Sequence, residues 1–192
     1  MKIKSINTMK KHIESWFLKA SHIQTVKGKI WYKEACKLAH SKGRVNAWKL
    51  AQIISVLSPQ VDWETNKKNA LLVWDCLQAG NDIHGVKIFA TCLQKDMCER
   101  IYNNTDEIPT TAVKTYNFAN NIYNPINSDY ITIDRHAVKV ALNDLKAGGV
   151  AITKKQYKEV SKAYTAIANK HMLLPCELQA ITWLTYKDTV GR

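Results

Sequence analysis

The sequence predicts an all-α protein of about ten helices with little or no sheet, and three observations carry this prediction. Apolar residues recur every three or four positions through most of the chain, which is the spacing of one helix face. Breaks containing Pro, Gly or Ser separate these segments. Apolar residues make up 46% of the 192 residues, enough for one domain core or for two small helical lobes sharing a cleft.

The first half of the chain divides into four long amphipathic segments and two short ones. We expect helices over residues 6–20, 29–40, 46–57 and 63–79, with shorter pieces at 84–92 and 95–103. The segment 46–57 carries a nearly continuous apolar run, which predicts a buried central helix. Pro59 ends that helix, because the residue before a proline is disfavoured in α geometry.

The second half contains clearer start and stop signals. Pro109 fits the first position of a helix through Ile122. Residues 130–133 fit either a short strand or a buried lead-in to a helix over 134–145 that ends at Gly148-Gly149. Thr153 and Gln156 form a capping box for a long helix, and Pro175 begins the last one.

The net charge of +12 indicates a polyanionic partner. Residues 1–50 hold twelve Lys or Arg and only two acids, a net of +10, so the excess is concentrated in the first quarter. Nucleic acid explains this concentration best, because each neutralised phosphate releases counterions. Charge kept for solubility is the plainer alternative, and an anionic membrane surface is a minor third one.

The five cysteines favour a reducing compartment. They are odd in number and include no Cys-x-x-Cys pair, so they predict neither a disulfide framework nor a zinc site. The sequence has no signal peptide and no apolar run long enough to span a bilayer. We therefore expect a cytoplasmic protein, in the host cytoplasm if a phage encodes it, with no membrane, metal or cofactor requirement.

Three motifs in order resemble the helix-hairpin-helix DNA glycosylases of the endonuclease III type. Leu57-Ser-Pro-Gln60 is similar to the family's Leu-Ser-x-Gln, whose Gln enters the duplex. Pro109 and Lys114-Thr115 keep the spacing of the hairpin motif Leu-Pro-Gly-x-Gly-x-Lys-Thr, with its reactive Lys. Ile131-Thr-Ile-Asp134-Arg-His136 resembles the hydrophobic stretch that ends in Asp-x-His, the Asp being essential. The resemblance covers roughly residues 47–145.

Two departures qualify the resemblance. Thr110 and Ala112 stand where the family has hairpin glycines, whose backbone N–H groups approach a phosphate closely. The hairpin is therefore either degenerate or binds DNA differently. The family's four-cysteine iron–sulfur signature is also absent, since only Cys176 follows Asp134.

The chain is still more similar to a phage-centred branch of this superfamily, the alpha-glutamyl/putrescinyl-thymine pyrophosphorylase-like proteins, from residue 47 onward. The shared elements are Leu57-Ser-Pro-Gln-Val-Asp-Trp63-Glu-Thr-Asn66, Lys114 with Phe118-Ala-Asn-Asn-Ile122, a Thr-x-Asp-Arg-His segment, and Pro175-Cys-Glu-Leu-Gln179-Ala-Ile-Thr-Trp183. This resemblance implies action on a modified base. In that branch the proposed reaction replaces pyrophosphate on an activated 5-hydroxymethyluracil with an amine or amino acid.

Together these resemblances imply a single glycosylase-like domain over residues 1–192. Its parts would be basic N-terminal helices (1–45), a helix-hairpin-helix core (46–145) and C-terminal helices closing the other lobe (146–192). We expect a monomer that binds DNA, with double-stranded DNA and a flipped base the leading form. The expected activity is a DNA glycosylase, with or without lyase activity, on a modified or hypermodified pyrimidine. The alternatives are the transferase reaction above and a non-catalytic DNA-binding module on the same fold.

The resemblances assign roles to particular residues. Asp134 would stabilise positive charge on the sugar, and Lys114 would attack its C1′ as an amine. Gln60 would fill the gap left by the flipped base. The remaining candidates for contact with substrate or DNA are Asp62, Trp63, Asn66, Thr110, Thr111, Arg135, His136, Gln179 and Trp183.

Each candidate also has a plainer interpretation. Asp134 fits a helix N-cap, and both roles are compatible. Lys114 fits an ordinary exposed helix lysine, Gln60 a turn residue and Trp63 a core residue. Gln179 and Trp183 lie four residues apart, as two neighbours on a half-buried helix face do.

Overall fold

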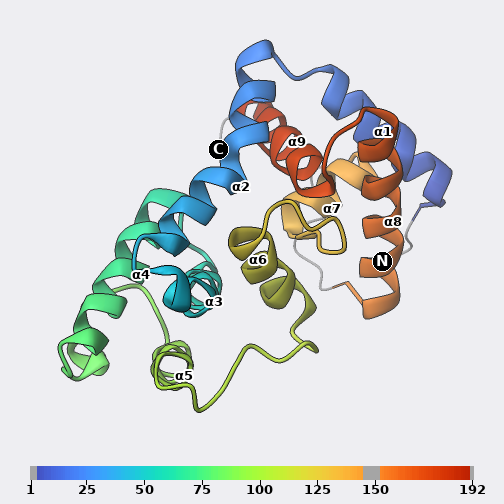
Figure 1. The fold of residues 1–192 in the computed structure, drawn as a ribbon. Coiled ribbons are helices and arrows are strands. Elements are labelled where there is room, and N and C mark those ends of the chain that lie inside the picture. Colours follow the sequence, from blue (N-terminus) through green and yellow to red (C-terminus); the bar gives the residue numbers. More distant parts are fainter. Residues whose placement is uncertain (1–3, 145–151, 191–192) are drawn as a thin grey trace. The chain divides into compact units, whose positions relative to one another are not determined.

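In a computed structural model the chain is all-helical over the residues that the structure describes, 4–144 and 152–190, which confirms the predicted fold class (Figure 1). The helices in this part of the chain are α1 (Ile6–Leu18), α2 (His22–His40), α3 (Ala47–Leu57), α4 (Trp63–Gln78), α5 (Cys92–Tyr102), α6 (Val113–Tyr123), α7 (Arg135–Leu142), α8 (Lys154–Lys170) and α9 (Pro175–Val190). Short 3₁₀ turns lie at Arg44–Asn46 and Ile83–Gly85.

The chain divides into two compact units. The terminal unit combines Met1–Ala35 with Asn124–Arg192, and the central unit is Cys36–Tyr123. The boundary falls inside α2, so this helix contributes residues to both units.

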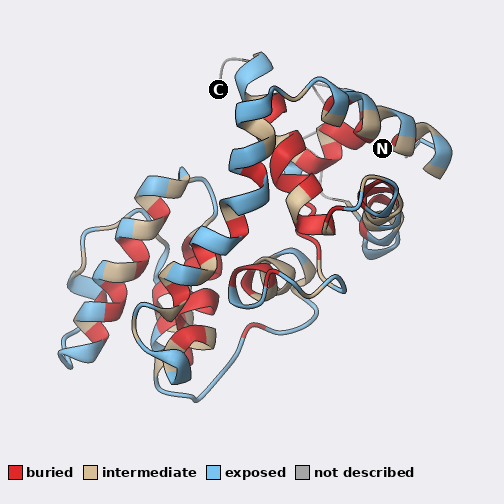
Figure 2. Ribbon diagram, turned by 45° about the horizontal axis from the view of Figure 1, so that its top comes forward, coloured by how far each residue is buried: buried red, intermediate tan, exposed pale blue. Residues whose placement is uncertain are grey.

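The terminal unit is built around α1, which packs against α7, α8 and α9. Met9, Ile13 and Trp16 are the buried face of α1, as their spacing predicts. Most helices of the chain bury one stripe in this way (Figure 2). The N-terminal part of α2 approaches α9 closely at Gly28, where a Cβ would come within 2.7 Å of the Ile181 backbone.

The central unit is organised by α3, which packs against α4, α5 and α6. Residues from Leu50 to Leu57 are all buried, which confirms the predicted buried helix. Two polar side chains in this run are used to hold neighbouring segments. The Gln52 Oε1 accepts a hydrogen bond from Ile108 N at 2.8 Å, and Ser55 Oγ donates to Thr115 O at 2.6 Å.

The second helix is longer than predicted. It begins at His22 rather than near residue 29, because Ser21 and Gln24 form reciprocal hydrogen bonds ahead of it. Gly28 is tolerated inside the helix because its missing Cβ permits the contact with Ile181. The Ser21-x-x-Gln24 pattern was the sequence signal for this start.

The helix predicted at 84–92 is wrong. Only Ile83–Gly85 forms a 3₁₀ turn there, and α5 spans Cys92–Tyr102 instead of residues 95–103. Thr91 and Gln94 form a capping box that sets the start of α5. The buried Lys95 amine then holds the preceding segment by donating to His84 O and Val86 O.

One predicted helix start in the second half shifts, and one open alternative is decided. Pro109 does not begin a helix: Ala112 N donates to Pro109 O at 2.9 Å, closing a turn, and α6 begins at Val113. The alternative of a strand over 130–133 is excluded for these residues, which form an extended, largely buried lead-in to α7.

The remaining boundaries follow the sequence signals. The Thr153–Gln156 capping box and the start of α9 at Pro175 are confirmed. The helix predicted over 134–145 ends earlier, at Leu142, because Asn143 adopts a left-handed conformation with φ 47°. The predicted stop at Gly148-Gly149 lies outside the described residues. Within the described part, no helix has the length and apolar content needed to cross a membrane.

Candidate active site

The segment before α7 is held in part by Tyr157. The Tyr157 hydroxyl donates to Ile131 O at 2.7 Å and accepts from Ile133 N at 3.0 Å. These bonds satisfy backbone groups that a neighbouring strand would otherwise pair. These two bonds help to position the residue that follows the segment, Asp134.

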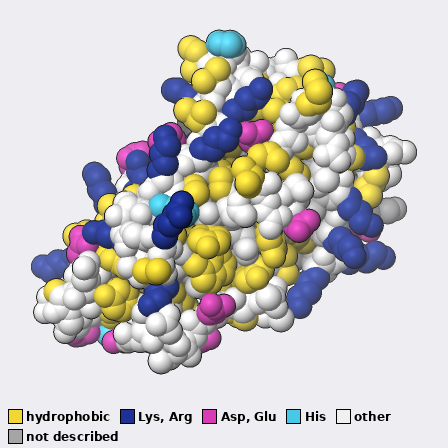
Figure 3. Space-filling model, in the orientation of Figure 1, with side chains coloured by type: hydrophobic (Ala, Val, Ile, Leu, Met, Phe, Trp, Pro, Cys, Tyr) yellow, Lys and Arg dark blue, Asp and Glu magenta, His cyan; other side chains and the backbone are white. Residues whose placement is uncertain are grey.

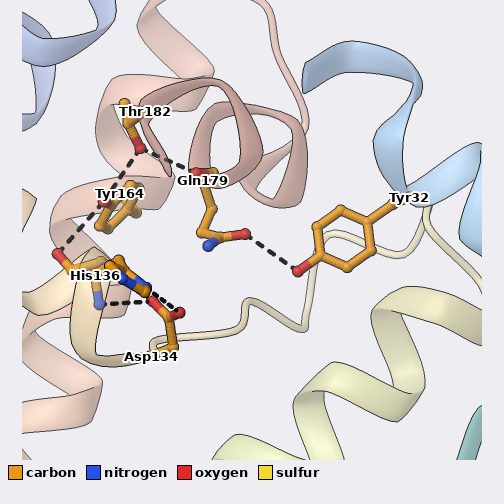
Figure 4. A network of polar contacts seen from close by, with 7 residues as sticks. Tyr32, Asp134, His136, Tyr164, Gln179 and Thr182 are labelled. Atoms are coloured by element: carbon orange, nitrogen blue, oxygen red, sulfur yellow. Dashed lines mark hydrogen bonds and ion pairs between the residues drawn. The ribbon is translucent and has the colours of Figure 1, made fainter. Parts of the chain in front are cut away.

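Asp134 is the N-cap of α7 (Figure 4). Its Oδ1 accepts from His136 N at 3.0 Å and from Ala137 N at 2.8 Å, and its Oδ2 lies 3.1 Å from His136 Nδ1. Its side chain is nevertheless 24% exposed. The carboxylate is therefore fixed at a helix N-terminus and is still accessible from solvent.

The two residues after Asp134 differ in environment. The Arg135 side chain is exposed, as contact with a phosphate requires. The His136 ring is held between the Asp134 carboxylate and the Tyr186 ring, whose centroid is 5.7 Å away. His136 therefore acts on the position of Asp134 as well as presenting its own ring.

Gln179 lies on α9, and Figure 4 shows it in the same close-up as Asp134. It is 6% exposed, and its Oε1 accepts a hydrogen bond from the Tyr32 hydroxyl at 3.1 Å. Burial raises the pKa of Tyr32 well above its ordinary value, and the charge of Asp134 contributes to the increase. The phenol thus remains a neutral donor.

A second buried network joins α7, α8 and α9. The Tyr164 hydroxyl lies 3.4 Å from Ala137 O and 3.3 Å from Thr182 Oγ1, which itself donates to Gln179 O (Figure 4). Burial raises the pKa of the Tyr164 phenol. These contacts fix α9 against α7, and hence Gln179 relative to Asp134.

Trp183 follows Gln179 by one helical turn and is only partly buried. Its ring packs edge-on against Trp31, with centroids 6.0 Å apart, and Lys187 Nζ lies 4.8 Å from its centroid. These contacts give Trp183 a packing role in addition to the predicted contact with substrate or DNA.

In the central unit, the turn after α3 presents the predicted wedge residue. Gln60 is exposed and adopts a left-handed conformation with φ 65°. For a residue other than glycine or asparagine this conformation costs about 1–3 kcal/mol. The turn thus holds Gln60 out from the surface at a local energetic cost.

Asp62 is the N-cap of α4, as Asp134 is of α7. Its carboxylate accepts from Thr65 N at 2.9 Å and from Thr65 Oγ1 at 2.7 Å, and these bonds hold its pKa below the ordinary value. Asp62 is exposed and anionic, so it would repel a phosphate.

The other two candidates on α4 differ in exposure. Trp63 is partly exposed, with Lys67 Nζ 5.9 Å from its ring centroid. Asn66 is buried, and its Nδ2 donates to Ile54 O at 3.1 Å, while its Oδ1 has no partner within the described chain. The hydrogen bond gives Asn66 a structural role between α3 and α4.

The segment that matches the hairpin forms a turn without any left-handed residue. Among the described residues, positive φ occurs at Gln60, Asn104, Asn143, Met172, Gly43 and Gly80, and at none of residues 109–112. Thr110 and Thr111 are exposed at this turn, and Lys114 is exposed as the second residue of α6. The turn therefore differs from one that depends on glycine.

A protein-family model matches residues 1–190, and it is described as a family of unknown function, DUF7178. The chain belongs to the DUF7178 family. Comparison with curated proteins and with solved structures finds no match.

For this DUF7178 member, the terminal unit brings Asp134, His136 and Gln179 together. Lys114, Gln60 and the other central-unit candidates lie on a different unit from Asp134. The sequence prediction missed Tyr32 and Tyr157. Tyr32 and Gln179 are 147 residues apart, and only the fold brings them into contact.

Proposed function

We propose that this protein is a DNA base-processing enzyme of the DNA glycosylase type, acting on a modified or hypermodified pyrimidine, with Asp134 as the catalytic carboxylate. The observation that carries the proposal is the geometry of Asp134. Two backbone N–H groups and the His136 ring fix this carboxylate, yet its side chain is 24% exposed. The exposed part of the side chain leaves the carboxylate accessible to a substrate.

The chemistry of base removal needs such a group. Breaking the bond between C1′ and the base nitrogen develops positive charge on the sugar, and a fixed carboxylate stabilises that charge. The base departs with the electrons of the broken bond and takes up a proton from solvent, and water then adds to C1′ and loses a proton. Asp134 stabilises the sugar cation and can accept the proton of the water.

Lys114 has a separate role in the proposal. Its amine would displace the base at C1′, and opening of the sugar ring would then give a Schiff base, which is the intermediate of a lyase step. The amine is exposed at the start of α6, where DNA can reach it. Hydrolysis assisted by Asp134 does not require Lys114, so the two residues are tested separately.

DNA is the proposed partner because of charge. The net charge is +12, and α1 and α2 present exposed cations at Lys11, Lys27, Lys29, Lys33 and Lys37. Figure 3 shows Lys and Arg side chains projecting across the face that it draws. The exposed Gln60 is the proposed wedge for a flipped base, which implies double-stranded DNA. We propose a cytoplasmic monomer, consistent with contact with DNA.

One observation favours a second candidate, a non-catalytic DNA-binding module. The Asp134 carboxylate makes the hydrogen bonds of an ordinary N-cap. The turn at 109–112 also lacks the left-handed conformations that glycines permit. A protein that retained the fold for binding alone would have both features.

The deciding experiment measures the mass of nucleosides after reaction. Duplexes carrying 5-hydroxymethyluracil, or its phosphorylated forms, are incubated with the protein, with and without an amine donor, and then digested. A lost base supports the glycosylase. A heavier nucleoside contradicts base removal and supports the transferase reaction. No change on any substrate, combined with tight DNA binding, supports the binding module.

Matched variants test the two catalytic assignments. Asp134→Asn should abolish the reaction, while Asp82→Asn, at the N-cap of the 3₁₀ turn Ile83–Gly85, should leave it unchanged. Lys114→Gln should abolish only a borohydride-trapped DNA adduct. Lys155→Gln changes the equivalent second position of α8 and is its control. Full activity in Asp134→Asn would exclude the proposed mechanism.

A further inference from the structure

The central unit contains an open pocket of about 310 Å³ that none of the predicted site residues lines. It lies between α3, α5 and the segment that follows α5. The residues that form it include Trp48, Lys49, Gln52, Asn104, Asp106 and Glu107. Its volume is at the lower end of the range for small-molecule sites.

Gln52 provides a hydrogen-bond donor within this pocket. Its side chain is 1% exposed, and its Oε1 accepts from Ile108 N at 2.8 Å. That bond fixes the orientation of the amide, since a flipped amide would place two donors against each other. The Nε2 therefore points elsewhere, and the Oε1 bond is the one side-chain hydrogen bond of Gln52 among the described residues. Because Gln52 lines the pocket, this donor is available to an acceptor bound there.

The wall and rim supply the complementary groups. The Trp48 indole offers an aromatic surface, and its Nε1 donates to Glu107 Oε1 at 3.3 Å, which holds that carboxylate beside the ring. The second oxygen of Glu107 remains an acceptor. Lys49 also lines the pocket, and its Nζ donates to Tyr102 O at 2.8 Å.

The charge of the lining excludes phosphate. Asp106 and Glu107 are both acidic and Lys49 is the one cation among the residues that line the pocket. Arg100 Nε lies 3.2 Å from Asp106 Oδ2, so the guanidinium offsets the negative charge of this carboxylate. No cluster of cations is present there to hold a phosphate. The groups available are one fixed donor, one carboxylate acceptor and an indole ring.

We propose that this pocket binds a small, neutral, planar heterocycle that carries a carbonyl next to a ring N–H, as in a uracil-type nucleobase or nucleoside. The carbonyl oxygen accepts from Gln52 Nε2, the ring lies along Trp48, and the ring N–H donates to the Glu107 carboxylate. This proposal is independent of the chemistry assigned to Asp134, because all the residues involved belong to the central unit.

The test is a titration of the full chain with uridine. Binding is measured by calorimetry, and the side-chain amide signals of Gln52 are monitored by NMR in ¹⁵N-labelled protein. We expect uridine to bind and to shift the Gln52 signals. N3-methyluridine, which lacks the ring N–H, should bind at least about tenfold more weakly. Uridine 5′-monophosphate should also bind more weakly than uridine, because of the acidic rim.

Three variants connect the binding to the named groups. Glu107→Gln keeps an oxygen for Trp48 Nε1 but removes the negative charge. Because Glu107 is exposed, we expect this variant to fold normally. Gln52→Glu keeps an oxygen for Ile108 N and removes the donor, and Trp48→Leu removes the ring. Each should weaken uridine binding about tenfold or more, while Lys68→Gln, an exposed position on α4, should not.

Either of two results would overturn the proposal. One is the absence of uridine binding at millimolar concentration. The other is binding that Glu107→Gln and Trp48→Leu leave unchanged, or that N3-methyluridine reproduces at equal strength. Because Glu107→Gln and Trp48→Leu do not alter the buried amide, a folding defect in Gln52→Glu does not affect this judgement.

Discussion

The Tyr32 hydroxyl donates a hydrogen bond to Gln179 Oε1 at 3.1 Å, joining α2 to α9 inside the terminal unit. A hydrogen bond from Thr132 to Tyr32 supports the direction of this contact, since it lowers the pKa of a phenol that burial raises. Because its oxygen is occupied, Gln179 has its Nε2 as the group left to donate. Among the described residues, the hydrogen bonds of Gln179 outside the helix ladder involve its Oε1 and its backbone oxygen. The proposed active site thus contains a fixed carboxylate and an amide donor of fixed orientation.

Tyr32→Phe should therefore reduce recognition of a base carbonyl rather than the chemical step. Without the phenol the Gln179 amide can rotate, at a cost of about 0.5–1.5 kcal/mol in binding, so KM should rise up to about tenfold while kcat changes little. Tyr102→Phe, in the central unit, is the control. Equal losses in kcat and kcat/KM would show instead that Tyr32 supports the transition state.

Two substitutions of Asp134 should have different effects on stability and on activity. Asp134→Asn keeps a side-chain oxygen for His136 N and Ala137 N, so thermal unfolding should be nearly unchanged, while activity falls by roughly 10²-fold or more. Asp134→Ala should lose activity and also about 1–2 kcal/mol of unfolding free energy. Asparagine that destabilises as much as alanine would mean that the charge itself holds the cap.

The sequence predicted the local features of the fold well. Spacing alone identified the buried face of α1 and the nearly continuous burial of α3, and capping residues located the start of α8. The start of α2 was missed because a glycine inside a helix is unfavourable by local rules. In the structure Gly28 permits a close contact with Ile181, 153 residues away. Local rules do not contain such distant contacts.

The candidate site likewise has features that local sequence predicts and features that depend on distant contacts. Asp134 was predictable because its N-cap role and its motif fall within a few residues. The Tyr157 bonds to Ile131 and Ile133, and the Tyr32 bond to Gln179, connect positions 24 to 147 residues apart. The choice between a strand and a helix lead-in at 130–133 could not be made without Tyr157, which replaces the partner strand.

Gly28→Ala tests the close approach of α2 and α9. The new Cβ would lie 2.7 Å from Ile181 backbone atoms, so the helices must separate, and we expect a loss of about 1–3 kcal/mol in unfolding free energy. Gly85→Ala, where a Cβ meets nothing within 4 Å, should be nearly neutral. Equal thermal stability of the two variants would contradict the packing described for α2 and α9.

Glu14 should make the terminal unit sensitive to acid. Its carboxylate lies 2.7 Å from both Lys170 Nζ and His171 Nε2, and the hydrogen bonds to Lys170 and then to His171 hold its pKa below the ordinary 4.5. Since the folded pKa is depressed, the stabilisation is complete above the unfolded value and is lost as pH falls through the folded one. Glu14→Gln should make the unfolding free energy depend less steeply on pH below about pH 4.5. Urea unfolding at several pH values measures this dependence. An unchanged dependence would show that other groups cause the loss of stability in acid.

Salt dependence gives the sharpest test of the DNA partner. If the basic quarter contacts phosphates, log K should fall linearly with log salt concentration, with a slope of about 0.9 for each phosphate contacted on duplex DNA. Lys27→Gln with Lys29→Gln, both exposed on α2, should then reduce the slope by up to about 1.8. Lys158→Gln with Lys162→Gln removes the same charge from exposed positions on α8 and should change the slope less. Equal effects of the two pairs would mean that net charge alone attracts DNA, and a flat salt response in the unmodified protein would remove the electrostatic support for a DNA substrate.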